Sequence, residues 1–109
     1  MYTIDIHSNK ETIDAAIYNL DIGIKIARQN KEKILCVITG YGSHNTKHKI
    51  KSAIILKLEE YVNKKYVKGY ILGNEVDIFN ARYQSFPNKE KLGKEEFINK
   101  NPGVIYVAL

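Results

Sequence analysis

Several features that would identify a class of protein are scarce in this chain. It has one cysteine, so it can form neither an internal disulfide nor a thiolate metal cluster. No apolar run approaches the roughly 20 residues that a membrane helix needs. Residues 1–5 lack the basic start and apolar middle of a signal peptide. These absences predict a cytoplasmic protein with no membrane partner.

The length and composition are those of one globular domain over residues 1–109, because 44% of the residues are hydrophobic and 27% are charged. The formal net charge is +5 and the pI is near 9.2. Such an excess favours an anionic partner: nucleic acid, a phosphorylated ligand or an acidic protein. A solvated lysine-rich surface would give the same total, so the charge alone does not locate a site.

The first third of the chain predicts a strand, a helix and a second strand. Residues 2–6 alternate between apolar and polar, as a short strand does. Apolar side chains recur with helical spacing over residues 13–27, and residues 33–38 are an apolar run typical of a strand covered on both faces. This order predicts a right-handed crossover that joins parallel strands.

The start of the first helix is ambiguous. Thr12 can cap it, whereas Ser8 with Glu11 fits a capping box one turn earlier. Gly23 lies in the helix interior, where glycine is unfavourable, and so predicts a close packing contact.

The rest of the chain predicts a second helix and two further strands. Residues 46–65 carry an apolar stripe every fourth residue, which predicts an amphipathic helix. Residues 66–72 predict a strand that a glycine interrupts, so an edge position or a bulge is expected. Residues 104–109 are almost continuously apolar and predict a strand inside the sheet.

Residues 74–101 have the least regular pattern. A connection of this length is usually functional or partly mobile. Its apolar side chains Val76, Ile78 and Phe79 are expected to dock on the core, and residues 95–100 predict one or two helical turns.

A glycine loop joins the second strand to the second helix. Glycines allow a sharp turn and a close approach to a ligand, and the free N–H groups at a helix start attract anions. Neither a dinucleotide fingerprint nor a Walker loop is completed, so no nucleotide cofactor is predicted. The aromatic ring of the loop is expected either to stack on a base or to hold the loop by packing. The predicted nucleic-acid-binding residues are Gly40, Tyr41, Gly42, Ser43, His44, Lys47 and Lys51.

Asp5 and His7 end the first strand and share one face of it, because strand side chains alternate. They can act as an acid/base or water-orienting pair. The alternative is an aspartate that caps a turn and an exposed histidine. His44 and His48 have the spacing of metal ligands, but no third ligand is near. No metal site is therefore predicted, although a divalent cation is left open for cleavage.

Two other groups have simple structural interpretations. Cys36 lies between apolar residues and is expected to be a buried thiol. Lys64, Lys65 and Lys68 are expected to form a solvated helix end in preference to a second contact site.

Three separated motifs together resemble one family, the small MutS-related (Smr) domain. Residues 4–7 (Ile-Asp-Ile-His) resemble its Leu-Asp-Leu-His signature, and residues 39–43 (Thr-Gly-Tyr-Gly-Ser) resemble its His-Gly-x-Gly-Ser/Thr loop. Lys47 takes a place that is usually arginine. Residues 102–109 resemble the closing Gly-x-Thr-x-Val-x-Leu strand.

The resemblance implies a two-layer α/β sandwich of βαβαββ order, with helices on one side of a mixed four-stranded sheet, similar to the C-terminal domain of bacterial translation initiation factor three. It implies nucleic-acid binding and, in several members, endonucleolytic cleavage of DNA or RNA, as in DNA repair or RNA processing. Asp5 and His7 match the first motif, and Gly40 and Gly42 match the loop that approaches phosphate. Residues 74–101 resemble an insertion.

Three positions depart from the family pattern. Thr39 stands where the loop has histidine, Ser8 replaces a glycine, and His44 takes a position that is often glycine. Two functions therefore remain open. The first is a nucleic-acid-binding domain that also cleaves phosphodiester bonds with Asp5 and His7. The second is a non-catalytic module that binds RNA, the ribosome or a protein and has lost cleavage together with the loop histidine.

Overall fold

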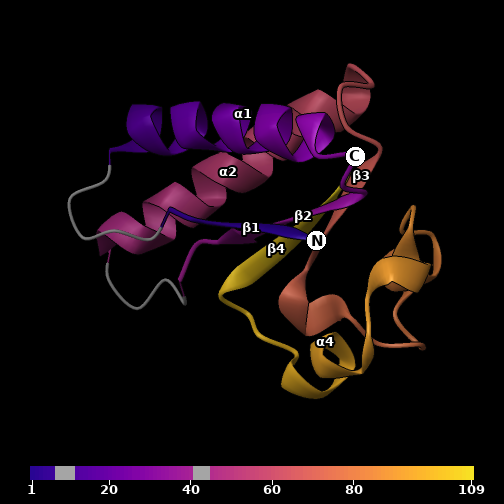
Figure 1. Cartoon of the computed structure of the whole chain (residues 1–109). Coiled ribbons are helices and arrows are strands. Elements are labelled where there is room, and N and C mark those ends of the chain that lie inside the picture. The colour runs from indigo at the N-terminus through magenta and orange to yellow at the C-terminus, as the bar shows by residue number, and fades with distance from the viewer. Residues whose placement is uncertain (7–11, 41–44) are drawn as a thin grey trace.

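A computed structural model describes residues 1–6, 12–40 and 45–109, and of residues 45–48 it describes the backbone only. The described residues form a mixed four-stranded sheet in the order β1-β2-β4-β3 (Figure 1). β1 and β2 are parallel, whereas β4 is antiparallel to both of its neighbours. This is the predicted fold class. The strands are β1 (Tyr2–Asp5), β2 (Ile34–Ile38), β3 (Gly69–Leu72) and β4 (Val104–Ala108).

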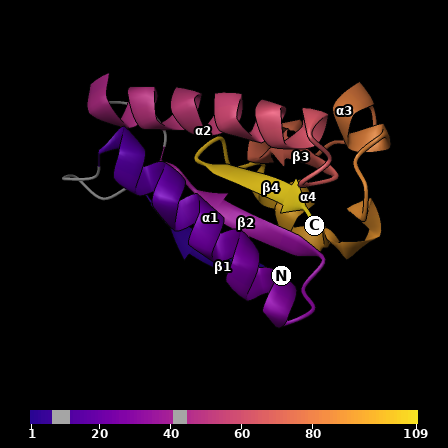
Figure 2. The same cartoon turned by 90° about the horizontal axis from the view of Figure 1, so that it is seen from above.

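Two long helices, α1 (Ile13–Gln29) and α2 (Asn45–Asn63), lie together on one face of the sheet (Figures 1 and 2). Thr12 caps α1, because its hydroxyl accepts a hydrogen bond from the Ala15 N–H at 3.1 Å. The start at Thr12 is therefore confirmed, and the competing capping box lies outside the described residues. None of the helices that the structure describes is long and apolar enough to span a membrane.

The helices bury their apolar stripes against the sheet. A Cβ atom at Gly23 would lie 2.7 Å from Ile4 Cδ1, so any larger residue there would displace the Ile4 side chain, and the predicted close packing contact is confirmed. This layer contains the larger of the two clusters of buried hydrophobic residues, and burial of apolar area stabilises the fold by roughly 25 cal/mol per Å². Its fully buried large side chains include Leu20, Ile24, Leu35, Val37, Ile50, Ile54, Leu58 and Ile105.

The other face of the sheet is covered by residues 73–100, which include most of the stretch 74–101 that resembled an insertion (Figure 1). The two long helices lie on one side as predicted, but this segment adds a third layer to the expected two. Val76, Phe86 and Leu92 are buried there, next to Cys36 of β2. The expected turns at residues 95–100 are confirmed as α4. The elements of the segment are η1 (Gly73–Glu75), α3 (Ala81–Gln84), η2 (Lys89–Lys91) and α4 (Lys94–Asn99).

The docking prediction for the same segment is right for one residue and wrong for two. Val76 is fully buried, but Ile78 is 58% exposed and Phe79 is 86% exposed. The reason is a local turn, because the Asp77 carboxylate accepts a hydrogen bond from the Phe79 N–H at 2.9 Å. Lys100 donates to the same carboxylate at 2.9 Å and fixes the turn with both apolar side chains outside.

The positions of the last two strands follow the prediction. β4 is central and buried along its whole length, and β3 is an edge strand. β3 is shorter than expected, because the N–H groups of Tyr66 and Val67 bond back to the carbonyl of Tyr61 at 2.8 and 3.3 Å. These bonds end α2 before the chain can enter the sheet at Gly69.

Candidate functional site

The C-terminal ends of β1 and β2 lie side by side at one edge of the molecule. Asp5 is the register partner of Ile38, and the Ile6 N–H donates to the Ile38 carbonyl at 2.9 Å. Both helices begin at this edge, because each runs back along the sheet from a parallel strand (Figure 2). The end of the first motif and the start of the glycine loop are therefore neighbours.

The first glycine of the loop is held against the turn that precedes β4. The Gly40 N–H donates to the Gly103 carbonyl at 3.1 Å, and Gly40 has φ of 77°, which favours glycine. A Cβ atom at Gly103 would lie 3.2 Å from the Gly40 carbonyl carbon. The Gly103 N–H in turn donates to the side chain of Asn101 at 2.8 Å. Two glycines from distant motifs thus allow two backbone segments to touch.

Thr39 points into the protein. Its side chain is fully buried, and its hydroxyl lies 3.3 Å from the Gly103 carbonyl and 3.4 Å from the Gly40 carbonyl. Its backbone N–H also donates to Gly103 at 2.8 Å. Thr39, which stands where the similar loop of the Smr family has histidine, is therefore a structural part of the loop base, and its side chain does not face solvent.

Two charged residues of the prediction flank this junction. Asp5 is exposed at the end of β1. Lys51, half-buried on α2, donates from Nζ to the Pro102 carbonyl at 2.8 Å, which places a cation over the turn before β4. We call Asp5, Gly40, Lys51 and the turn at residues 102–103 the strand-end site. The structure places the predicted residues Asp5, Gly40 and Lys51 at this edge, together with the turn at residues 102–103, which was not predicted as part of the site.

The other predicted site residues stay predictions. They are His7, Tyr41, Gly42, Ser43 and His44, which lie outside the described residues, and Lys47, of which only the backbone is described.

The chemistry of metals and thiols is limited within the described part of the chain. No three His, Cys, Asp or Glu side chains gather there as a ligand set. Cys36 is buried as expected, and burial raises the pKa of its thiol to about 11 against the opposing effect of a hydrogen bond from Thr3. The thiol is therefore protonated and unreactive near neutral pH.

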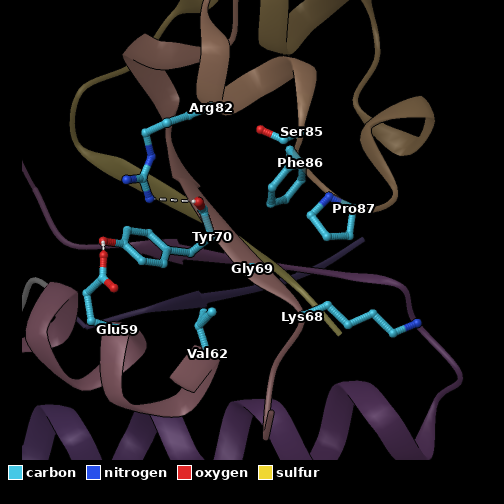
Figure 3. A pocket seen from close by; sticks show the side chains of 9 residues that line it. All are labelled: Glu59, Val62, Lys68, Gly69, Tyr70, Arg82, Ser85, Phe86 and Pro87. Carbon is cyan, nitrogen blue, oxygen red and sulfur yellow. Dashed lines mark hydrogen bonds between the residues drawn. The ribbon is translucent and has the colours of Figure 1, made fainter. Parts of the chain in front are cut away.

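A pocket of about 330 Å³, which no sequence pattern indicated, lies between α2, β3 and α3 (Figure 3). The Arg82 guanidinium lies 4.6 Å from the Tyr70 ring centroid and donates to the Tyr70 carbonyl at 3.2 Å. The Tyr70 hydroxyl donates to Glu59 at 2.6 Å, and burial followed by this bond raises the pKa of Tyr70.

These contacts stabilise β3, which is the edge strand of the sheet. Glu75 accepts the Leu72 N–H at 2.9 Å and lies 3.6 Å from Arg82 Nε. Backbone groups that an edge strand would otherwise offer to another chain are thus paired with side chains. The residues of the pocket therefore stabilise β3, and the side chains of Glu59, Tyr70 and Arg82 are already engaged with one another or with the strand.

The comparisons with known proteins agree with this architecture. No protein-family profile matches the chain, and no curated protein sequence matches it. Its structure is similar to that of the Smr domain of Thermus thermophilus MutS2, with a TM-score of 0.62 and 18% sequence identity. The similarity covers 100% of this chain and 98% of that domain. The alignment therefore includes residues 73–100, and the chain has an Smr-like fold.

Proposed function

We propose that this chain binds nucleic acid through the strand-end site. The observation that supports the proposal is the junction of the β1 and β2 ends with the Gly40–Gly103 contact and the Lys51 ammonium. The loop after Gly40 leads directly into the N-terminus of α2, whose free N–H groups attract phosphate. The net charge of +5 adds a general attraction for polyanions.

The proposed contacts have different roles. Backbone N–H groups of the loop and the ammonium groups of Lys47 and Lys51 bind phosphate oxygens, which positions the nucleic acid without reading its sequence. Tyr41 stacks on a base or ribose. The loop N–H donors are those of Gly42, Ser43 and His44. Gly40, whose own N–H is bonded to the Gly103 carbonyl, has no side chain and lets the phosphate approach the backbone. A cytoplasmic location and a role in DNA repair or RNA processing belong to the same proposal.

Cleavage is a second candidate, and the exposed carboxylate of Asp5 beside the loop favours it. In that reaction Asp5 and His7 orient and deprotonate a water molecule that attacks the phosphodiester phosphorus. The buried Thr39 argues the other way, because the loop base offers no acid or base to the leaving oxygen. Binding is accordingly the primary function that we propose.

The binding test compares two double variants of equal charge change. Lys47→Gln/Lys51→Gln removes both site cations, whereas Lys91→Gln/Lys94→Gln removes two exposed lysines near the opposite face of the sheet. Fluorescence anisotropy measures affinity for labelled single- and double-stranded DNA and RNA at several salt concentrations. Each phosphate contact on a single strand contributes about 0.7 to the salt slope, so losing two at 0.1 M salt weakens binding roughly 25-fold.

Equal affinity of both double variants would reject the strand-end site as the contact. Absence of binding by the unmodified chain to any of the four nucleic acids at low salt would reject nucleic-acid binding altogether.

The cleavage test incubates the same labelled substrates with the unmodified chain and with Asp5→Asn, with and without Mg²⁺ or Mn²⁺. Cleavage that disappears in Asp5→Asn supports a nuclease. Binding without cleavage by the unmodified chain supports the non-catalytic module.

A further inference from the structure

The C-terminal halves of α1 and α2 enclose a second hollow, at the end of the helical layer opposite the strand-end site. The two helices start at the same edge and diverge toward their C-terminal ends (Figure 2). The space between them has a volume of about 560 Å³. We call it the inter-helix hollow, and its lining residues are Asp21, Lys25, Tyr61, Lys64, Lys65 and Tyr66.

Aromatic and cationic groups alternate around the hollow. The rings of Tyr61 and Tyr66 meet edge to face, with centroids 4.9 Å apart. The Arg28 guanidinium lies 4.5 Å from the Tyr66 centroid and also donates to the Tyr66 carbonyl, and Lys57 Nζ lies 5.7 Å from the Tyr61 centroid. The Tyr61 hydroxyl donates to Asp21 of α1, which ties the two helices together. The hollow is therefore preformed.

The charge in and around the hollow is positive. Glu60 is held by Lys57 at 2.9 Å and by Lys64 at 3.0 Å, so its charge is compensated within α2. Asp21, the other carboxylate, accepts from Tyr61. Throughout the part of the chain that the structure describes, Lys25 and Lys65 have no carboxylate partner. Their ammonium groups are available to an external anion.

An exposed aromatic side chain extends this surface along α1. Tyr18 is 65% exposed and precedes Lys25 by seven residues, which is two helical turns, so both project from the same face of α1. A large aromatic ring exposed to this degree contributes little to the core. Two turns from Lys25 on the same face of α1, it is suited to stacking on an unpaired base of a strand bound at the hollow.

We propose that the inter-helix hollow is a second nucleic-acid contact, specific for single strands. Lys25 and Lys65, whose ammonium groups have no carboxylate partner among the described residues, bind phosphates, and Tyr18 stacks on a base. Cations interleaved with aromatic rings favour a single strand over a duplex, because only unpaired bases present their faces. The inference extends the proposed function, since it places a second contact at the far end of the helical layer.

The first experiment removes the two unpaired cations. Lys25→Gln/Lys65→Gln is compared with Lys91→Gln/Lys94→Gln in anisotropy titrations with a labelled 20-nucleotide DNA and RNA. Loss of two single-strand phosphate contacts at 0.1 M salt predicts binding weakened roughly 25-fold and a salt slope lower by about 1.4. The control variant carries the same net charge, so its affinity measures the non-specific part of the effect.

The second experiment removes the stacking ring. Base–aromatic stacking is worth about 1–3 kcal/mol, so Tyr18→Ala is expected to weaken single-strand binding roughly tenfold and to leave duplex binding unchanged. Phe79→Ala is the matched control, because Phe79 is an 86% exposed ring near the other face of the sheet. Thermal unfolding midpoints of all variants must agree, which shows that affinity and not folding is altered.

The results separate this inference from the proposed function. Weaker binding only in Lys47→Gln/Lys51→Gln overturns the inter-helix hollow and keeps the strand-end site. Weaker binding only in Lys25→Gln/Lys65→Gln supports the hollow and rejects the strand-end site. Weakening by both pairs supports both contacts. An equal loss from Tyr18→Ala on single strands and duplexes would overturn the single-strand specificity.

Discussion

The two faces of the sheet are covered in different ways. On one face, α1 and α2 present long apolar stripes with a regular period, and they bury a continuous set of large aliphatic side chains. On the other face, residues 73–100 form four short elements and anchor themselves with a few buried residues. We call the cover formed by α1 and α2 the helical face and the cover formed by residues 73–100 the segment face. The helical face follows from the periodicity of the two helices, whereas the segment face depends on a few individual contacts.

The segment face has no repeating apolar pattern, and side-chain to backbone hydrogen bonds fix its short elements instead. The Asn80 side chain caps α3 by accepting from the N–H groups of Arg82 and Tyr83 at 2.9 and 3.2 Å. The Glu96 carboxylate accepts from the Gly93 N–H at 2.7 Å at the start of α4. Such bonds fix the path of the chain but bury little apolar area. We therefore expect the helical face to carry most of the stability and the segment face to open more easily.

The largest effect is expected from Leu58→Ala in α2. Leu58 is completely buried in the helical face, so the lost contacts and the cavity cost about 4 kcal/mol of unfolding free energy. Leu56→Ala is the control on the same helix, because Leu56 is 71% exposed and its truncation changes stability by less than about 0.5 kcal/mol. Urea unfolding measures both. Similar losses for the two variants would contradict the assignment of the buried face.

Gly73→Ala tests how tightly the segment face joins the sheet. A Cβ atom there would lie 2.0 Å from the Asn101 carbonyl oxygen and 2.6 Å from Val104 Cγ2, so the backbone must move. Overpacking of this kind is expected to cost about 3 kcal/mol. Gly93→Ala, whose nearest contact would be 3.7 Å away, should be nearly neutral in the same unfolding experiment. Two neutral substitutions would mean that the segment is not packed as described.

Val76→Ala measures an anchor of the segment face. It removes two methyl groups from a fully buried site and is expected to cost about 2 kcal/mol. Phe79→Ala removes a larger side chain three residues later, yet should change stability by less than about 0.5 kcal/mol because the ring is in solvent. Hydrogen exchange should show faster opening of residues 73–100 in Val76→Ala, with α1 and α2 unchanged. Equal acceleration in the helices would show that the two faces open together.

The smallest effect is a pH dependence from Cys36, which lies under the segment face. Its folded pKa of about 11 exceeds the unfolded value of 9.0, so the folded protein holds the proton more tightly. The resulting stability is fully present below pH 9 and is lost as the pH rises toward 11. The difference in unfolding free energy between the unmodified chain and Cys36→Ala should therefore shrink by roughly 1 kcal/mol between pH 8 and 10. A constant difference would contradict burial of the thiol.

The sequence predicted the helical face and its sheet well, and the segment face poorly, for one physical reason. Helical and strand periods are repeated over many residues, so α1, α2 and β4 are visible without tertiary information. Val76 and Phe79 are both apolar and lie three residues apart, but the Asx turn at Asp77 decides that Val76 faces the core and Phe79 faces solvent. A bond of that kind leaves no repeating pattern in the sequence.

The candidate site shows the same division. The motifs at Asp5 and Gly40 could be recognised along the chain, and the parallel crossover made their proximity predictable. Burial of Thr39 against Gly103 could not be foreseen, because it depends on the turn that enters β4, 64 residues away. The inter-helix hollow was also missed. Lys64 and Lys65 resemble a solvated helix end until the divergence of α1 and α2 places Lys25 opposite them.

By itself the sequence determined the number and order of the main elements, the parallel crossover, the central place of β4 and the basic character of the surface. These properties follow from local periods and from totals, which the chain carries whatever its conformation. Only the tertiary structure decided which irregular residues cover the second face, that Thr39 points inward, and where cations and aromatic rings converge. Those outcomes depend on contacts between residues far apart in the chain, which become definite only when the helices and the sheet have packed.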